Sequence, residues 1–330
     1  MSQHNTFDIT MPPAPSKPFF FTADPRITLT VETDEGPLLL AGEYLRCHNQ
    51  DSYIRCTVDG EEKIAKLMAR PVSREHLRWL SSQRAPHANM LWVERPFVWD
   101  KGMEFGYLTR VFTKDYVPLH FLFAQKKMTL ELALRLMLTY TQAMNNTHRR
   151  GLLFPVCHGA ENCYVDPDIG HLLVGHCEHI VRLGQPLQKP AYRGIYAAPE
   201  LITDQTAQPT MESNRHFLAT LIFRCLFGGH PLEGKKAKKP LTAVDKTLLG
   251  TAPVFVFDPK DRSNAPRADQ ADMVGRWNAA PDHVRELFER AFSREALLDP
   301  SQRPTETDFE NMLARYIGEP RTDIPCMVQP

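Results

Sequence analysis

Three stretches of this 330-residue chain are the most informative about its fold, and the first is Tyr196-Ala197-Ala198-Pro199-Glu200-Leu201. The second, Asp299-Pro300-Ser301-Gln302-Arg303-Pro304-Thr305, follows about a hundred residues later. Between them we predict a helix over residues 217–227, which ends at Gly228-Gly229. Its residues are apolar almost all round, and this is typical of a helix buried in the middle of its domain.

The rest of the chain after residue 113 has the same helical period. Apolar residues recur at helical spacing between about 129 and 149, where Gly151 follows as a stop. Two more amphipathic segments follow Pro281 and Thr305. The second part of the chain is therefore predicted to be helical.

The first part of the chain has a different period. From Ile27 apolar residues alternate with threonines, and residues 53–58 are rich in strand formers. Asp59-Gly60 then offers the positive φ angles of a tight hairpin before a second strand at 63–68. This pattern predicts an antiparallel sheet.

One helix and two further strands complete this first part. Ser73 can cap a helix that runs through Leu80. Strands are expected at 90–93 and 106–111. The predicted unit is thus a small sheet with a single helix.

Composition narrows the class of protein. The 39 Lys and Arg residues balance 39 Asp and Glu residues, so no net positive field exists to hold nucleic acid or an anionic membrane. No apolar run is long enough to span a membrane, and the first residues do not resemble a secretory signal. Seven scattered cysteines are a poor disulfide framework and are expected mostly in the core. We therefore expect a cytoplasmic protein.

Four segments follow from these patterns. Residues 1–24 are polar and contain several prolines, which predicts a flexible N-terminal arm. Residues 25–112 form the β-rich unit and residues 113–318 the helical unit. Residues 319–330 are expected to be a C-terminal tail.

The three stretches at 196–201, 217–227 and 299–305 resemble, in this order and spacing, the large lobe of protein kinases. The first resembles the Ala-Pro-Glu motif that closes the activation segment. Ile64-Ala65-Lys66 resembles the kinase strand Val-Ala-Ile-Lys. Four other stretches have kinase-like patterns: the hinge-like 106–111, the catalytic-loop-like 158–159, and the strand pair 164–166 and 172–174.

This resemblance covers about residues 38–317 and implies a fold. It implies an α+β, protein kinase-like two-lobe fold, with a small antiparallel β-rich N-lobe that has one helix and a larger α-helical C-lobe. More narrowly, the chain resembles bacterial kinase-like proteins of tellurite-resistance-type operons. These are encoded beside von Willebrand A-type proteins and metal-dependent protein phosphatases, which the resemblance implies as protein partners.

The resemblance also assigns roles to residues. Four residues would contact the nucleotide or position the lysine that does: Lys66, Glu75, Thr109 and Val111. Three residues would be structural: Glu200 and Arg303, which would form a bidentate ion pair, and His158 of the catalytic loop.

Several positions depart from the kinase pattern. The loop before Tyr53 has no glycine, and Asp51 would put a negative charge near the phosphates. Ala160 stands where kinases have the catalytic Asp, and His176 stands at the metal-binding Asp. Asn214 replaces a buried Asp that holds the catalytic loop, which fits a loop whose geometry no longer needs fixing.

We therefore expect a pseudokinase that binds or regulates protein partners in a signalling or stress-response module. One alternative is an active, atypical Ser/Thr kinase that uses Glu161 as base with Asn162 and Glu178, the latter two as weak metal ligands. Another is a nucleotide-binding domain without turnover. ATP is left open as a ligand, and magnesium is not expected.

A cluster of cysteines and histidines at 157–179 raises a rival chemistry, because thiolate and imidazole are the ligands that zinc prefers. The spacings contain no Cys-x-x-Cys pair, and strands with alternating faces would scatter the side chains. Core packing is the alternative, and the sequence leaves both open.

Overall fold

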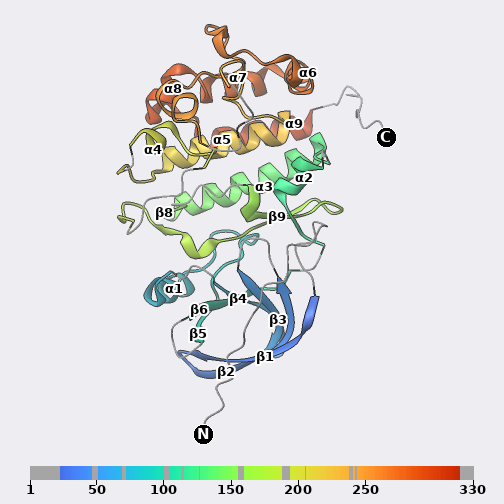
Figure 1. Cartoon of the computed structure of the whole chain (residues 1–330), viewed down its shortest axis with the longest axis vertical. Coiled ribbons are helices and arrows are strands. Elements are labelled where there is room, and N and C mark those ends of the chain that lie inside the picture. Colours follow the sequence, from blue (N-terminus) through green and yellow to red (C-terminus); the bar gives the residue numbers. More distant parts are fainter. Residues whose placement is uncertain are drawn as a thin grey trace.

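The computed structural model describes residues 23–46, 51–68, 72–99, 104–112, 115–125, 127–154, 160–187, 194–204, 206–237, 241 and 244–319. It has an antiparallel β part in the first third of the chain and a helical part in the rest (Figure 1). This mixed architecture agrees with the two periods of the sequence. Of the predicted arm and tail, all but Ala23, Asp24 and Glu319 lie outside the described residues.

Six antiparallel strands form a closed barrel in the order β1-β2-β3-β4-β6-β5. Their bounds are β1 Ala23–Thr33, β2 Gly36–Arg46, β3 Ser52–Val58, β4 Glu61–Leu67, β5 Arg95–Trp99 and β6 Glu104–Arg110. The sequence predicts only a sheet. The sheet closes because the end of β1 pairs with β5, where Glu32 lies opposite Val98 and Thr33 lies opposite Phe97.

Side-chain alternation gives the barrel wall two faces. Ala65 and Leu67 of β4 belong to the apolar core inside the barrel. Ile64 and Lys66 of the same strand therefore face outward, toward the helical part. This outward face of β4 carries the candidate site.

The strongest local signals of the sequence are confirmed. Asp59 and Gly60 turn the β3–β4 hairpin with φ angles of 53° and 81°. Helix α1 (Arg74–Ser81) begins at Ser73, whose hydroxyl accepts a hydrogen bond from a backbone N–H at 3.2 Å. Helix α3 (Leu130–Arg149) begins in the same way at Thr129.

The strand expected at 90–93 is wrong. Met90 makes only an isolated bridge to Val174. The N–H of Leu91 donates to the carbonyl of Val174 at 2.9 Å, so the segment is tied to the layer beyond the barrel rather than to a barrel strand. The segment joins the two parts of the protein.

A layer of short strands lies between the barrel and the long helices (Figure 1). A three-stranded sheet has the order β10-β9-β7, and β8 pairs with β11. The bounds are β7 Val117–Pro118, β8 Leu152–Leu153, β9 Cys163–Asp166, β10 His171–Val174 and β11 Val181–Arg182, with 3-10 turns η2 Ala160–Asn162 and η3 Cys177–His179. The turn η3 follows β10 closely and meets the outward face of β4.

The helical part packs around α5 (Met211–Phe227), which is buried almost all round, as its sequence predicts. Helix α3 packs against both α5 and α9 (Glu306–Gly318). The other helices are α2 Leu119–Ala124, α4 Pro199–Thr203, α6 Ala271–Ala279, α7 Asp282–Ala291 and α8 Arg294–Leu298, with a π-helical turn Thr247–Thr251 and 3-10 turns Arg262–Asn264, Ala268–Gln270 and Pro300–Gln302. Within the described residues, no helix has both the length and the apolar character needed to cross a membrane.

His230, just after α5, is locked in its neutral form. Its Nε2 donates to the carbonyl of Ile195 at 2.9 Å, and its Nδ1 accepts from the N–H of Leu232 at 3.1 Å. Burial lowers the pKa of His230 from 6.5 to about 3. The unfolded chain therefore binds a proton at a pH where the folded protein does not, and stability is lost as the pH falls through this window.

We expect the free energy of unfolding to fall by about 1.4 kcal/mol per pH unit for this histidine between pH 6.5 and about 3. Urea unfolding at a series of pH values measures this slope. His230→Gln keeps a donor but cannot titrate, so its slope should be shallower by about that amount. An unchanged slope would contradict the assignment.

Candidate functional site

The candidate site lies where the outward face of the barrel meets η3. Strand register places Tyr53 of β3 and Tyr107 of β6 on either side of Lys66. The Lys66 ammonium lies 5.9 Å from the ring centre of Tyr53 and 5.8 Å from that of Tyr107. The lysine side chain is only 2% exposed, so its charge must be neutralised by the protein.

Two carboxylates neutralise Lys66. Its Nζ lies 2.5 Å from Oε1 of Glu178, in η3, and 2.9 Å from Oδ2 of Asp51. The other oxygen of Glu178 accepts a hydrogen bond from the Tyr107 hydroxyl at 2.8 Å. Both carboxylate oxygens of Glu178 therefore have a partner, and its side chain is only 3% exposed.

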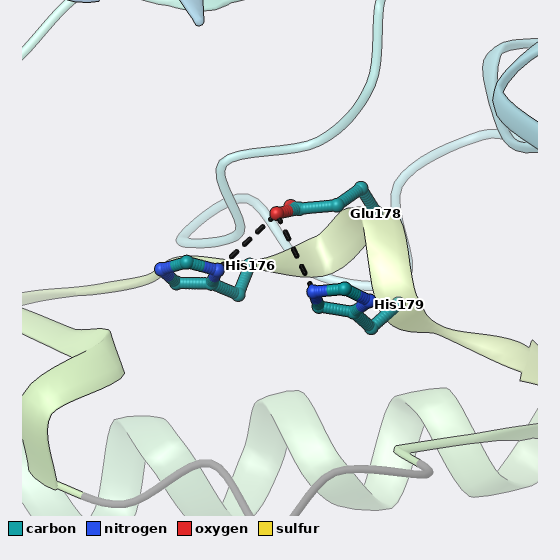
Figure 2. A group of neighbouring side chains, drawn as sticks. All are labelled: His176, Glu178 and His179. Carbon is teal, nitrogen blue, oxygen red and sulfur yellow. Dashed lines mark ion pairs between the residues drawn. The ribbon is translucent and has the colours of Figure 1, made fainter. Parts of the chain in front are cut away.

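Two imidazoles complete this cluster (Figure 2). The Nδ1 of His176 lies 3.2 Å from Oε1 of Glu178, and the Nε2 of His179 lies 3.8 Å from the same oxygen. The two rings are nearly parallel, with centres 6.1 Å apart. His176 has a left-handed backbone (φ 54°), which turns the chain sharply between β10 and η3.

In this cluster, neighbouring charges and burial shift the pKa values of Lys66 and Glu178 in opposite directions. Burial would lower the pKa of Lys66, but Glu178 and other neighbours hold it well above its usual value. Burial would raise the pKa of Glu178, but Lys66 and His176 hold it well below its usual value. Burial, followed by the Glu178 charge, raises the pKa of Tyr107 well above normal, so this hydroxyl stays a donor.

The sequence predicts that Lys66 pairs with Glu75 of α1, but the structure gives it other partners. Glu75 is exposed, whereas Lys66 is buried with Asp51 and Glu178. Glu75 lies about 200° around the helix from the buried Leu77, so it faces away from the core. His76 instead reaches the site, with Nε2 3.0 Å from the backbone carbonyl of Glu178. Its i, i+4 spacing from buried Leu80 is a signal that could have identified it.

Thr109 and Val111, the two other predicted nucleotide contacts, lie beside the cluster around Lys66. Both side chains are packed against other residues of the protein. Thr109 is 1% exposed, and its hydroxyl makes no hydrogen bond with the described residues. Val111 packs on a group that we call the aromatic cluster, made of Tyr53, Ile64, Leu91, Phe112, Tyr164 and Leu173. Within it Phe112 stacks on Tyr164, with ring centres 6.0 Å apart and planes 12° apart. These side chains come from both parts of the protein and fill their junction.

The positions expected to carry catalysis are only partly described. Ala160 begins η2 and is 1% exposed in the main core, so it presents no polar group. Asn162 ends η2 half-buried, and its backbone carbonyl accepts a hydrogen bond from the N–H of Gly175 at 2.9 Å. The side chain of Glu161 and the whole of His158 lie outside the described part of the chain.

Asn214 anchors the chain at Phe154, whereas residues 158–159, which the buried Asp of kinases would hold, lie outside the described residues. Its amide donates to the carbonyl of Phe154 at 2.9 Å and accepts from the N–H of the same residue at 3.3 Å. Its Oδ1 also lies 3.1 Å from Nε2 of His148. An Asp could not make the first of these bonds, because an ionised carboxylate only accepts.

We expect Asn214→Asp to lower the free energy of unfolding by about 1–3 kcal/mol, because the Phe154 carbonyl would lose its donor and face a carboxylate. Urea unfolding measures the change. Asn278→Asp, at an exposed position of α6, is the matched control and should change it by less than about 0.5 kcal/mol. Equal effects at the two positions would contradict this role for Asn214.

The predicted pair of Glu200 and Arg303 is formed. Nη1 and Nη2 of Arg303 donate to the two oxygens of Glu200 at 2.8 and 2.7 Å. The same guanidinium donates to the backbone carbonyls of Ala296 and Glu212, both at 3.0 Å. It therefore ties the start of α4 to α5 and α8.

The site does not fit magnesium. Magnesium prefers oxygen ligands, whereas among the described residues the group of possible ligands is His176, Glu178 and His179, and the carboxylates of Glu178 and Asp51 already bind Lys66. The two described cysteines of the 157–179 cluster are not part of this group: Cys163 and Cys177 are buried in the large hydrophobic core, and burial raises the pKa of the Cys177 thiol. Cys56 and Cys225 are also buried, while Cys47, Cys157 and Cys326 lie outside the described residues.

Two site residues, Tyr107 and Asp51, have roles that sequence reasoning missed. Tyr107 stands in the predicted strand, on the same face as Thr109, and alternation alone could have placed it beside Lys66. Asp51 carried no such signal, since it lies before the strand that pairs with β4. In the comparisons with known proteins, no family model and no curated protein matches the chain.

Proposed function

We propose that this chain is a bacterial, cytoplasmic pseudokinase: a kinase-like protein that regulates protein partners and transfers phosphate weakly or not at all. The observation that carries the proposal is the state of Lys66, whose ammonium is buried and held by Asp51 and Glu178. A kinase lysine contacts the nucleotide phosphates while one helix carboxylate holds it in place. Here both carboxylates come from outside α1, and a phosphate group at the Lys66 ammonium would have to displace Asp51 or Glu178.

The aromatic cluster supports the same proposal. Phe112 packs against both Tyr53 and Tyr164 at the junction of the two parts, with ring centres 6.1 and 6.0 Å apart. A nucleotide base bound beside Lys66 would have to displace these rings and break their contacts. Ala160 adds a third reason, because a buried methyl group cannot orient a hydroxyl.

Each missing element removes transition-state stabilisation. Loss of one charged or hydrogen-bonding group in such a site costs about 2.7–4 kcal/mol, and each tenfold in rate is about 1.4 kcal/mol. Combined loss leaves little activity. The folded surface remains, and a stable protein interface needs only about 800 Å² per partner. The partners that we propose are the von Willebrand A-type protein and the metal-dependent phosphatase of a tellurite-resistance-type stress module.

We expect the purified full chain to show no autophosphorylation and no transfer to a basic acceptor protein with labelled ATP and magnesium or manganese. Label that disappears in Lys66→Ala would overturn the proposal and favour the active kinase, with Glu161, Asn162 and Glu178 as its catalytic candidates. Co-expression with the two partner proteins tests the regulatory role. Failure of both to co-purify would leave no support for it.

A second function, nucleotide binding without turnover, is favoured by one observation. The Thr109 hydroxyl is buried without a hydrogen bond among the described residues, and a ligand could satisfy it. A ligand that binds only the folded protein raises its melting temperature. Melting with and without ATP therefore decides between the two: we expect no shift, and a magnesium-independent shift lost in Thr109→Val would favour the second.

A further inference from the structure

The Lys66 ammonium is surrounded by atoms of the kind that bind metal ions. It can only donate, and two carboxylate oxygens and one imidazole nitrogen converge on it: Oε1 of Glu178 at 2.5 Å, Oδ2 of Asp51 at 2.9 Å and Nδ1 of His176 at 3.4 Å. An ammonium with three such neighbours lies where a small cation would lie. The ammonium group of Lys66 is itself this cation.

The histidines beside it extend the set of ligands. One atom each from His176, Glu178 and His179 lie within 4.8 Å of one another (Figure 2). Oε1 of Glu178 is 3.2 Å from His176 Nδ1 and 3.8 Å from His179 Nε2. Ligands of a tetrahedral zinc ion, bound at about 2.0–2.1 Å, are about 3.3–3.4 Å apart. Small side-chain movements would therefore close these three groups around a metal.

The backbone holds these groups in place. The left-handed His176 and the 3-10 turn η3 bring positions 176, 178 and 179 to one side of the chain. The backbone carbonyl of Glu178 accepts from His76 of α1, and the thiol of Cys177 donates to the carbonyl of Val174 at 3.3 Å. The three side chains are thus presented from an anchored turn rather than from a loose loop.

Lys66 and a metal ion would compete for the same atom. Oε1 of Glu178 is the oxygen nearest to the ammonium and also the oxygen that both imidazoles approach. Two cations on one carboxylate oxygen repel each other strongly in a buried site. The lysine and the metal therefore exclude one another.

We propose that His176, Glu178 and His179 form a latent site for a divalent cation of the zinc type, and that the Lys66 ammonium occupies its cation position and keeps the metal out. Two imidazoles and one carboxylate favour zinc over magnesium or calcium. The inference rests on the cluster alone and not on the proposed function, so phosphate transfer assays do not bear on it.

The test removes the internal cation without changing the net charge. Lys66→Met leaves two buried carboxylates uncompensated, so the principal variant is Asp51→Asn/Lys66→Met, which removes one ammonium and one carboxylate together. Zinc binding is measured by calorimetry on the full chain. Cobalt(II) replaces zinc in a parallel titration, because its visible bands report a tetrahedral site and distinguish thiolate from imidazole ligands.

We expect the double variant to bind one equivalent of zinc that the parent does not bind at the same concentration, and zinc to raise the melting temperature of the variant only. Adding His179→Gln should weaken this binding by at least about tenfold. Zinc binding by the parent that is lost in His176→Gln or His179→Gln would overturn the proposal, since the lysine would then exclude nothing.

A folded double variant that binds no zinc, or binds it through thiolates, would also overturn it. If the double variant does not fold alone, refolding with and without zinc replaces the titration. Recovery of folded protein only with zinc supports the proposal, and no recovery in either case overturns it, because the metal should compensate Glu178 as the lysine did.

Discussion

Glu178→Leu is expected to lower the free energy of unfolding by about 3–5 kcal/mol, because it leaves the buried Lys66 ammonium with only one carboxylate. The parent pair lies at 2.5 Å with both side chains at most 3% exposed, so water cannot replace the lost partner. The Tyr107 hydroxyl loses its acceptor as well. Urea unfolding followed by circular dichroism measures the effect.

Two controls define the interpretation of this result. Glu75→Ala removes the exposed carboxylate of α1 and should change the free energy of unfolding by less than about 0.5 kcal/mol. Removal of all three charges, in Asp51→Asn/Lys66→Met/Glu178→Leu, should recover most of the loss, since apolar groups often replace buried ion pairs without cost. A large effect of Glu75→Ala with none of Glu178→Leu would restore the pairing predicted from the sequence.

Glu200→Ala is expected to cost about 3 kcal/mol, at the lower end of the range for a broken buried ion pair. Arg303 is 1% exposed and would keep its charge, but Glu200 is 30% exposed, so some water already reaches the pair. The two backbone carbonyls on the guanidinium remain and limit the loss. The midpoint of urea unfolding, at an unchanged slope, reports the cost.

The matched control for Glu200 is Glu212, also near the start of its helix. Its carboxylate lies 3.4 Å from Arg215, which is 19% exposed, against 1% for Arg303, and which also pairs with Glu306 at 3.1 Å. Glu212→Ala should cost at most about 1 kcal/mol. Similar costs for Glu200→Ala and Glu212→Ala would mean that the bidentate pair adds nothing to a surface contact.

Elements with strong local signals can be predicted from this sequence. The Asp59-Gly60 turn, the Ser73 cap and the apolar helix α5 each follow from a few neighbouring residues. Closure of the barrel cannot be predicted in this way, because it depends on pairing between Thr33 and Phe97, far apart in the sequence. The segment at 90–93 is apolar and strand-like, but its hydrogen bonds go to another layer.

In the candidate site, too, some residues can be predicted from local sequence and others depend on the tertiary fold. Lys66 and the pair of Glu200 and Arg303 can be identified from short motifs. The partners of Lys66 cannot, because the choice between Glu75 and Glu178 depends on which carboxylate the tertiary fold buries. Asn214 shows the same limit, because its residue type gives no sign of the two hydrogen bonds by which it anchors the backbone of Phe154.

The position of α3 between α5 and α9 has a consequence for synthesis on the ribosome. The barrel is built mostly from neighbouring strands, so it can form soon after β6 emerges. Helix α3 instead packs against residues that are synthesised much later. Its Asn145 donates a hydrogen bond to Glu310, 165 residues further along the chain. Until α9 is made, the apolar surface of α3 lacks part of its cover. We therefore expect nascent chains that end before α9 to be prone to aggregation and to depend on chaperones.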